Sequence, residues 1–439
     1  MTRQILPIAA LLLGSAFLLF AGGINALILP VRGTAEGFSS LSLGLLGTGW
    51  AVGYIAGCLV VPRLVARVGH IRSFSVMAAF AGCALLSSLL LVTPVAWIPL
   101  RAVSGFCFAG AAMIVESWLN ERVDAGSRGT VFGVYTMINL AATMTGQLVL
   151  ALGRPEGYTF FVIGAMFYAL ALVPTAVSSS ASPSPLVRTS LNVRELWQNS
   201  PIAVAACFLI GISNSAFGAL AAVYATQVGM SLVAVTLFAS IPILAGAIAQ
   251  LPVGFLSDRM DRRLVLILTA LVAIAADAYF LIVEPVTNTG LLIAVALFGA
   301  SIFTMYPVIV AHANDHAAPD SYVQTSGGLL LLFGIGSIFG PLMAGIAMSS
   351  FGTRGLFATT VVAHVVIVVY AVIRVAVRPA LPVEERTGFI GGPMPRMTTP
   401  QTAALAPDPE LIVVEAEAAE TPEPEPQGGE AKQEAQPPS

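Results

Sequence analysis

Two charged side chains, an arginine and a glutamate, lie within one long apolar stretch of the sequence. Residues 97–118 contain Arg101 and Glu116 and no other charge. A charged group is costly in hydrocarbon unless it is paired or hydrated, so such residues mark places where a membrane protein does chemistry. The two are 15 residues apart, about 22 Å on a helix that rises about 1.5 Å per residue. They therefore cannot pair with each other.

Each of these residues has a functional and a simpler interpretation. Arg101 either takes part in the mechanism or extends its guanidinium to the outer membrane interface. Glu116 is expected near the cytoplasmic ends of the helices, close to Arg67 or Arg128. Three roles are open for Glu116 at that position: a gating residue, a protonatable coupling group, or a charge at the membrane interface without a further role.

A cluster of charges follows the apolar run 232–256. Asp258 precedes Arg259, Asp261, Arg262 and Arg263. An acid at the membrane edge pairs with nearby arginines, and such pairs are able to hold the cytoplasmic side of a helical bundle shut. We therefore expect a charge latch here, formed by Asp258, Arg259 and Arg262. The alternative is a set of charges that only fixes the orientation of the chain in the membrane.

The first half of the chain carries a weaker copy of this cluster. Arg67 lies 192 residues before Arg259 and closes the second apolar run, but Ala66 stands where the second copy has Asp258. Arg67 is thus a candidate gating residue whose acidic partner is missing from its own cluster.

The elements that position these residues are membrane-spanning helices. Hydrophobic residues make up 57% of the chain and charged residues 10%, with a mean hydropathy of +0.88, whereas soluble domains have about a quarter of their residues charged. Apolar runs of about 20 residues are long enough to cross a bilayer as helices. We predict an all-α membrane protein with about twelve spans, near residues 5–30, 41–62, 73–93, 97–118, 129–150, 158–177, 201–225, 232–256, 264–284, 290–311, 323–348 and 356–377.

Polar residues divide these spans into two sets of six. We expect a bundle over residues 1–177, a cytoplasmic linker over 178–200 and a second bundle over 201–378. Positively charged residues favour the cytoplasmic side of a membrane. With the N-terminus inside, the outer loops hold only Arg32, Arg154 and Arg354, whereas the inner side holds thirteen arginines. Both termini are therefore predicted to be cytoplasmic, in the inner membrane. The thirteen are Arg3, Arg63, Arg67, Arg72, Arg122, Arg128, Arg188, Arg194, Arg259, Arg262, Arg263, Arg374 and Arg378.

The C-terminal residues 379–439 differ from the rest in composition. They hold 11 acidic and 3 basic side chains and 12 of the 28 prolines. Such a segment buries too little apolar surface to fold. We expect a disordered tail that is dispensable for folding and transport, and that is a candidate binding site for a soluble partner.

Small residues recur at helical spacing on several predicted spans. Such faces let two helices approach closely, and ordinary packing explains them better than ligand binding. They are Gly49, Gly53 and Gly57 on the second span, Gly129 and Gly133 on the fifth, and Gly336 and Gly340 on the eleventh.

Several of these motifs together resemble the major facilitator superfamily. The cluster from Gly254 to Arg263 is similar to that family's loop after the second helix of a half, with Asp261 in place of a glycine, and Arg101 to Gly105 resembles its Arg-x-x-x-Gly element. Met305 to Val308 and the stretch from Gly336 to Pro341 resemble the narrower YcaD-like group. The resemblance covers residues 5–378. It implies two pseudo-symmetric six-helix bundles and associates the Arg101 element with proton coupling.

The same resemblance indicates which residues face the solute. In this fold the first, fourth, seventh and tenth helices line a central cavity. Each polar or aromatic side chain on them either contacts the solute or joins two helices. Besides Arg101, the cavity candidates are Asn25, Asn214, Phe217, Tyr224 and Tyr306. Asp277 on the ninth helix and His364 on the twelfth are expected to partner neighbouring helices.

These observations predict a secondary active transporter of a small-molecule substrate, working by alternating access in the lipid bilayer, with coupling to protons as a further hypothesis. No nucleotide, metal, cofactor or nucleic-acid motif is present in the sequence, so neither an enzyme nor an ATP-driven pump is indicated. Two alternatives stay open. One is a uniporter of the same fold, and the other is a membrane sensor or scaffold that transports nothing.

Overall fold

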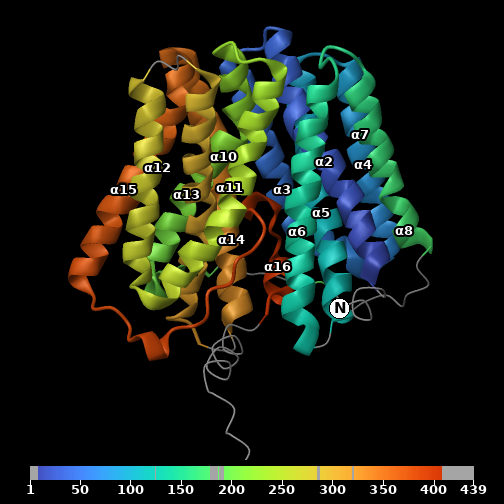
Figure 1. Cartoon of the computed structure of the whole chain (residues 1–439). Helices are drawn as coiled ribbons and strands as arrows, with labels where there is room; N and C mark the ends of the chain where they lie inside the picture. Colours follow the sequence, from blue (N-terminus) through green and yellow to red (C-terminus); the bar gives the residue numbers. More distant parts are fainter. Residues whose placement is uncertain are drawn as a thin grey trace, which may run out of the picture.

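The computed structural model describes residues 8–123, 125–177, 186, 192–283, 287–318 and 321–407. The described residues form helices and connecting turns (Figure 1). The first half holds α2 (Ala9–Ala35), α3 (Ser40–Val68), α4 (His70–Leu90), α5 (Pro94–Glu121), α6 (Arg128–Leu148), α7 (Thr159–Leu170) and α8 (Leu172–Val177). After α9 (Val193–Asn199), the second half holds α10 (Pro201–Gln227), α11 (Leu232–Arg259), α12 (Arg262–Ile282), α13 (Asn288–Asn314), α14 (Tyr322–Phe351) and α15 (Gly355–Val377).

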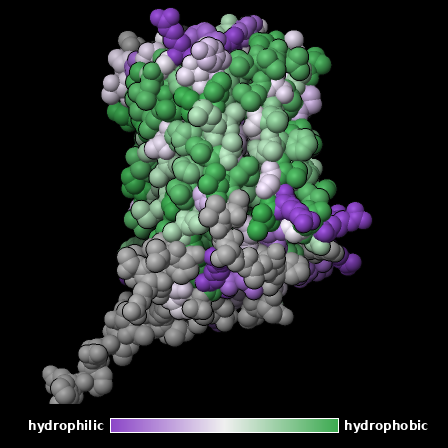
Figure 2. All heavy atoms as spheres, turned by 90° about the vertical axis from the view of Figure 1, so that its right-hand side faces the viewer, coloured by the Kyte–Doolittle hydropathy of each residue, from purple (hydrophilic) through white to green (hydrophobic). Residues whose placement is uncertain are grey.

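These helices account for the twelve predicted spans. Ten helical stretches of the described chain are long and apolar enough to cross a membrane. One of them, Tyr322–Val377, contains both α14 and α15, which are separated at Gly352, where φ is +71°. The shorter apolar stretch Thr159–Pro174 takes the place of the sixth span. Apolar side chains cover the middle of the face shown in Figure 2, and hydrophilic ones gather at its two ends.

Local sequence signals start the helices at matching places in the two halves. Ser39 caps α3 by accepting a hydrogen bond from the amide of Ser42. In the same way, Ser231 caps α11 by accepting a hydrogen bond from the amide of Ala234. A hydroxyl at this position satisfies one of the amides that a helix start leaves free. The two serines are 192 residues apart, which is also the spacing of Arg67 and Arg259. The repeat seen in the sequence thus has a structural counterpart.

Glycines set the closest helix contacts within each half. A Cβ on Gly53 of α3 would collide with the backbone carbonyl of Ala102 on α5, and one on Gly336 of α14 would collide with that of Phe208 on α10. The predicted small-residue faces on the second and eleventh spans therefore pack tightly. The prediction for the fifth span was wrong, because a Cβ on Gly129 or Gly133 would have no heavy atom of another element within 4 Å.

The two halves touch directly at one end of the molecule, which we call the closed end. There Thr48 donates to the carbonyl of Ile338 at 2.9 Å, and the Gln227 side chain donates to Ser40 at 3.2 Å. These contacts join α3 to α14 and α10 to α3. Toward the opposite end lies a space between the halves that we call the vestibule.

The vestibule is occupied by the chain itself. After α15 the chain passes through η6 (Val383–Glu385) and η7 (Pro395–Met397) to α16 (Pro400–Leu405), which contacts α5 of the first half and α14 of the second (Figure 1). The expectation of a disordered tail from residue 379 therefore fails for residues 379–407. The physical reason is that nine of the tail's acids follow residue 407, whereas Met394, Met397 and Leu405 supply apolar surface that is buried here. Residues 408–439 lie outside the described part.

Candidate solute site and latch

Arg101 lies about two turns after the start of α5, in contact with a small cavity. Its side chain is 6% exposed, and its Nη1 donates to the amide oxygen of Asn25 at 3.3 Å. The amide nitrogen of Asn25 donates in turn to the hydroxyl of Tyr168 at 3.5 Å. This chain of hydrogen bonds joins α5, α2 and α7. The guanidinium of Arg101 therefore does not extend to the outer membrane interface. This finding contradicts the simpler interpretation of Arg101.

The cavity beside Arg101 is lined by both apolar and polar side chains and carries positive charge. It measures about 50 Å³ and is bordered by Ser104, Thr143 and Gln147 as well as by Asn25 and Tyr168. Arg396 of the C-terminal segment lines it too, and no lining residue is acidic. The two guanidiniums thus share a cavity whose other polar groups are neutral.

Glu116 lies one to two turns before the end of α5 and is completely buried. Tyr135 of α6 donates to its carboxylate at 2.9 Å, Thr402 donates at 2.7 Å, and Thr399 donates as well. The expected neighbours are elsewhere, because Arg67 is exposed and Arg128 donates to Asn120 at 3.2 Å. The partners of Glu116 are therefore hydroxyl groups, two of them from α16 and the residue that caps it.

The latch region contains a buried ion pair that the sequence analysis did not identify. The Arg262 side chain, 1% exposed, lies 2.9 Å from the carboxylate of Asp315 and 3.7 Å from that of Asp258. Asp315 is 3% exposed and Asp258 46%, so Asp315 is the stronger partner. It directly follows α13, and a carboxylate immediately after the tenth span was the available signal.

The other predicted latch residues point away from this pair. Arg259 stacks on the ring of Phe255, 3.7 Å from its centre, on the exposed side of α11. Arg263 pairs with Asp261 at 2.7 Å and donates to the carbonyl of Arg378 at 2.8 Å, which ties α12 to the end of α15. Burial raises the pKa of Asp261, but the hydrogen bonds and charge of Arg263 outweigh it and hold that pKa below its ordinary value.

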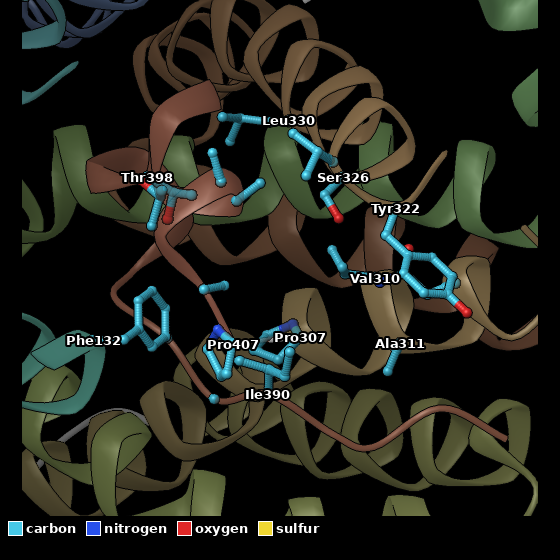
Figure 3. Close-up of a pocket in the computed structure, with 18 of the residues that line it drawn as sticks. Phe132, Pro307, Val310, Ala311, Tyr322, Ser326, Leu330, Ile390, Thr398 and Pro407 are labelled. Atoms are coloured by element: carbon cyan, nitrogen blue, oxygen red, sulfur yellow. The ribbon is translucent and has the colours of Figure 1, made fainter. Parts of the chain in front are cut away.

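A second cavity opens at the mouth of the vestibule. It measures about 230 Å³ and is lined by Phe132 of α6, by Tyr306 and Val310 of α13, by Ser326 of α14, and by the C-terminal segment. Figure 3 shows Ile390, Thr398 and Pro407 of that segment facing Val310 and Tyr322 across the space. Of the predicted cavity candidates, Tyr306 lines this space and Asn25 lines the smaller one.

The remaining candidates lie inside the second half and line neither cavity. The Asn214 side chain donates to the carbonyl of Ile302 at 3.3 Å, which joins α10 to α13. Phe217 and Tyr224 pack against Phe238 in an aromatic cluster, with ring centres 6.2 and 5.7 Å away. Within the described residues, no group of three or more His, Cys, Asp or Glu could hold a metal ion.

Comparisons with known proteins agree with this architecture. The sequence profile of the Major Facilitator Superfamily matches residues 11–321 and 204–406. An uncharacterized MFS-type transporter YcaD from Escherichia fergusonii is 26% identical over 354 residues, which span 80% of this chain and 91% of the relative. The uncharacterized MFS-type transporter YE1530 from Yersinia enterocolitica is 27% identical over 367 residues, with the same shares.

Solved structures share the fold at low sequence identity. The nucleoside transporter NupG superposes with a TM-score of 0.70 at 14% identity, over 84% of this chain and 98% of that one. A bacterial homologue of the human lysosomal transporter Spinster gives 0.67 at 16% identity, over 88% and 98%. The chain therefore belongs to the Major Facilitator Superfamily, as a multi-pass membrane protein of a transporter family.

Proposed function

We propose that this protein is a secondary active transporter that moves a small solute with an anionic group across the inner membrane. Arg101 carries the proposal. Its guanidinium is nearly buried on α5 of the first half, is hydrogen-bonded to a neutral amide, and faces a cavity without a carboxylate. A buried charge is costly unless an opposite charge accompanies it. A bound solute is the natural source of that charge.

The residues around Arg101 suit a carboxylate or phosphate. A guanidinium offers parallel N–H donors in a plane, which match two oxygens of such a group. Ser104, Thr143 and Gln147 add neutral polar atoms around the same space. Neutral donors fix the orientation of a solute, while the arginine selects its charge.

The arrangement of the halves supports alternating access. They meet at the closed end through α3, α10 and α14, and diverge around the vestibule. Related transporters expose a central site to either side by rocking two repeats against each other. With the arginine-rich side in the cytoplasm, the vestibule opens inward and both termini are cytoplasmic.

Coupling to protons is the finer part of the proposal, and Glu116 is its candidate. It is a buried carboxylate whose partners are hydroxyls rather than a cation, so a change in its protonation need not break an ion pair. A uniporter would use the same fold with Glu116 as a structural acid. A sensor or scaffold would bind a solute or partner without any flux.

Ligand binding to purified protein tests the proposed site. Thermal unfolding in detergent is compared with and without a panel of small carboxylates, phosphates and matched neutral analogues. We expect at least one anion to stabilise the protein, and Arg101→Gln to abolish that shift while Arg67→Gln, on the exposed end of α3, keeps it. Stabilisation by the neutral analogue alone, or a shift that survives Arg101→Gln, would contradict the proposal. Flux into proteoliposomes, with and without a pH gradient, then separates symport, uniport and binding without transport.

A further inference from the structure

Residues 386–407, which we call the plug, bind to both halves of the protein at once. On the first half, Thr399 and Thr402 donate to Glu116, and Tyr54 donates to the carbonyl of Thr398. On the second half, the amide of Phe389 donates to Asp258 at 3.0 Å, and Gln250 exchanges two hydrogen bonds with Gly392.

Carboxylates of the vestibule meet hydrogen-bond donors of the plug. The plug contains Arg386 and Arg396 and no acidic residue. Three carboxylates of the vestibule accept its hydrogen bonds, those of Glu116, Asp258 and Asp315, the last from both the amide and the hydroxyl of Thr387 at 2.9 Å. Polar groups of a buried segment need such partners, and here carboxylates on helices of both halves supply them.

The helices of the vestibule leave space for individual side chains of the plug. A Cβ on Gly254 of α11 would collide with the ring of Phe389, and one on Gly218 of α10 would collide with the guanidinium of Arg396. The same guanidinium lies 5.3 Å from the ring of Trp50 on α3. The surface therefore fits this segment in shape as well as in hydrogen bonding.

With the plug in place, little room is left at the proposed solute site. The cavity beside Arg101 measures about 50 Å³, and Met394, Arg396 and Met397 of the plug form part of its wall. Binding sites for small organic molecules are usually about 300–1,000 Å³. The plug and a solute of that size exclude each other. The plug also lies between α5 and α14, which must approach each other when the vestibule closes.

We propose that the plug is a self-inhibitory ligand of the vestibule, which holds the transporter open to the inside and has to leave before solute enters. The inference rests on the proposed alternating access. Residues 379–385 tether the plug directly to the end of α15, so it competes with solute at a high local concentration that does not depend on expression level. The C-terminal segment is thus a regulatory element rather than a dispensable tail.

Cysteine labelling tests the inference without a known solute. All four native cysteines are replaced, and Thr143→Cys serves as reporter, because the Thr143 hydroxyl lies 3.8 Å from the sulfur of Met397 in the plug. Gln198→Cys, on the exposed face of α9, is the control. Labelling by a water-soluble maleimide is compared in the full chain, in a chain that ends at Pro407 and in one that ends at Arg378.

We expect the chain that ends at Arg378 to label at least tenfold faster at Thr143→Cys than the other two, with equal rates at Gln198→Cys. A synthetic peptide of residues 386–407, at about 1 mM, the effective concentration of a short tether, should restore slow labelling, and a scrambled peptide should not. Equal rates in all three chains, or no effect of the peptide, would overturn the inference.

A full-length variant covers the case in which the shortened chain does not fold. Thr399→Val with Thr402→Val removes the two hydroxyl contacts that the plug makes to Glu116, whereas Glu385→Gln changes an exposed residue next to the plug. Faster labelling in the valine variant alone supports the plug, and unchanged labelling contradicts it. Since labelling needs no flux, an open vestibule without transport would contradict the proposed function and leave the plug intact.

Discussion

Replacing Asp315 by asparagine should destabilise the second half far more than the same change at Asp258. Asp315 lies 2.9 Å from the Arg262 guanidinium with both side chains almost fully buried, while Asp258 lies 3.7 Å away and is 46% exposed. At an effective dielectric constant of about 20, the closer pair attracts by about 6 kcal/mol; at the value of water, the exposed pair attracts by about 1 kcal/mol. Asparagine preserves the shape and removes the charge.

The net effects are smaller than these attractions but keep their order. Removing one partner of a buried pair typically costs about 3–5 kcal/mol, because the other charge stays buried, whereas exposed pairs contribute about 0–1 kcal/mol. We therefore expect Asp315→Asn to be less stable than Asp258→Asn by at least about 2 kcal/mol, a factor of about 30 in the unfolding equilibrium.

The assay is reversible unfolding of purified protein in mixed micelles with increasing SDS, followed by tryptophan fluorescence. It uses the full chain, because Thr387 contacts both Arg262 and Asp315 and so belongs to the surroundings in which the pair is buried. Arg259→Gln, at an exposed position, serves as the neutral control. Equal destabilisation by the two aspartate variants, or a larger effect at Asp258, would refute the argument from burial and distance.

Three further predictions follow from the geometry. Arg101→Lys should fold normally but reduce transport by the chain that ends at Arg378 at least about tenfold, about 1.4 kcal/mol, since lysine lacks the planar fork; full activity would return Arg101 to a structural role. Gly53→Ala should lower thermal stability because its Cβ meets the α5 backbone, whereas Gly133→Ala has free space, and equal melting temperatures would contradict this. Asp277→Asn should destabilise α12 against α15, since the carboxylate lies 2.7 Å from His364, and should leave the affinity for solute unchanged in binding measurements.

The length of the apolar runs predicted the spans, because a segment that crosses lipid must satisfy its own backbone hydrogen bonds as a helix. All twelve spans were predicted in this way, whereas the family was predicted from the resemblance of motifs such as the cluster from Gly254 to Arg263. The ends of spans were less predictable. The apolar run predicts an end of the first span near Pro30, but α2 continues to Ala35, because a proline in the last turns of a helix disturbs only bonds to the preceding turn.

Contacts between distant parts of the chain were the least predictable. Asp277 and His364 were expected to join neighbouring helices, and they do. Phe217 and Tyr224 were placed toward the cavity from their helices alone, and helical spacing does not say which face of a helix packs against α11 and α15. The roles of Asp315 and of the plug depend on pairings more than 50 residues apart. The position of Asp315 after the tenth span indicated a carboxylate at that helix end, but a single sequence does not indicate its partner.

The composition of the tail was misleading because it was averaged over the whole segment. Residues 386–407 contain no acid and several apolar side chains, whereas the nine acids after residue 407 dominate the total. Composition calculated over shorter stretches would have separated residues 386–407, which are able to pack against the protein, from the acidic residues that follow. Whether residues 408–439 bind a soluble partner stays a prediction.

Solute flux through the unplugged protein is the most direct test of the central claim. Proteoliposomes containing the chain that ends at Arg378 are exposed to a mixture of labelled small carboxylates and phosphates with their neutral analogues, with and without an inward proton gradient. We predict that at least one anion enters, that the full chain carries it at least about tenfold more slowly, and that Arg101→Gln blocks it. Absence of flux for every compound, in a protein whose Thr143→Cys variant shows an open vestibule, would contradict the account.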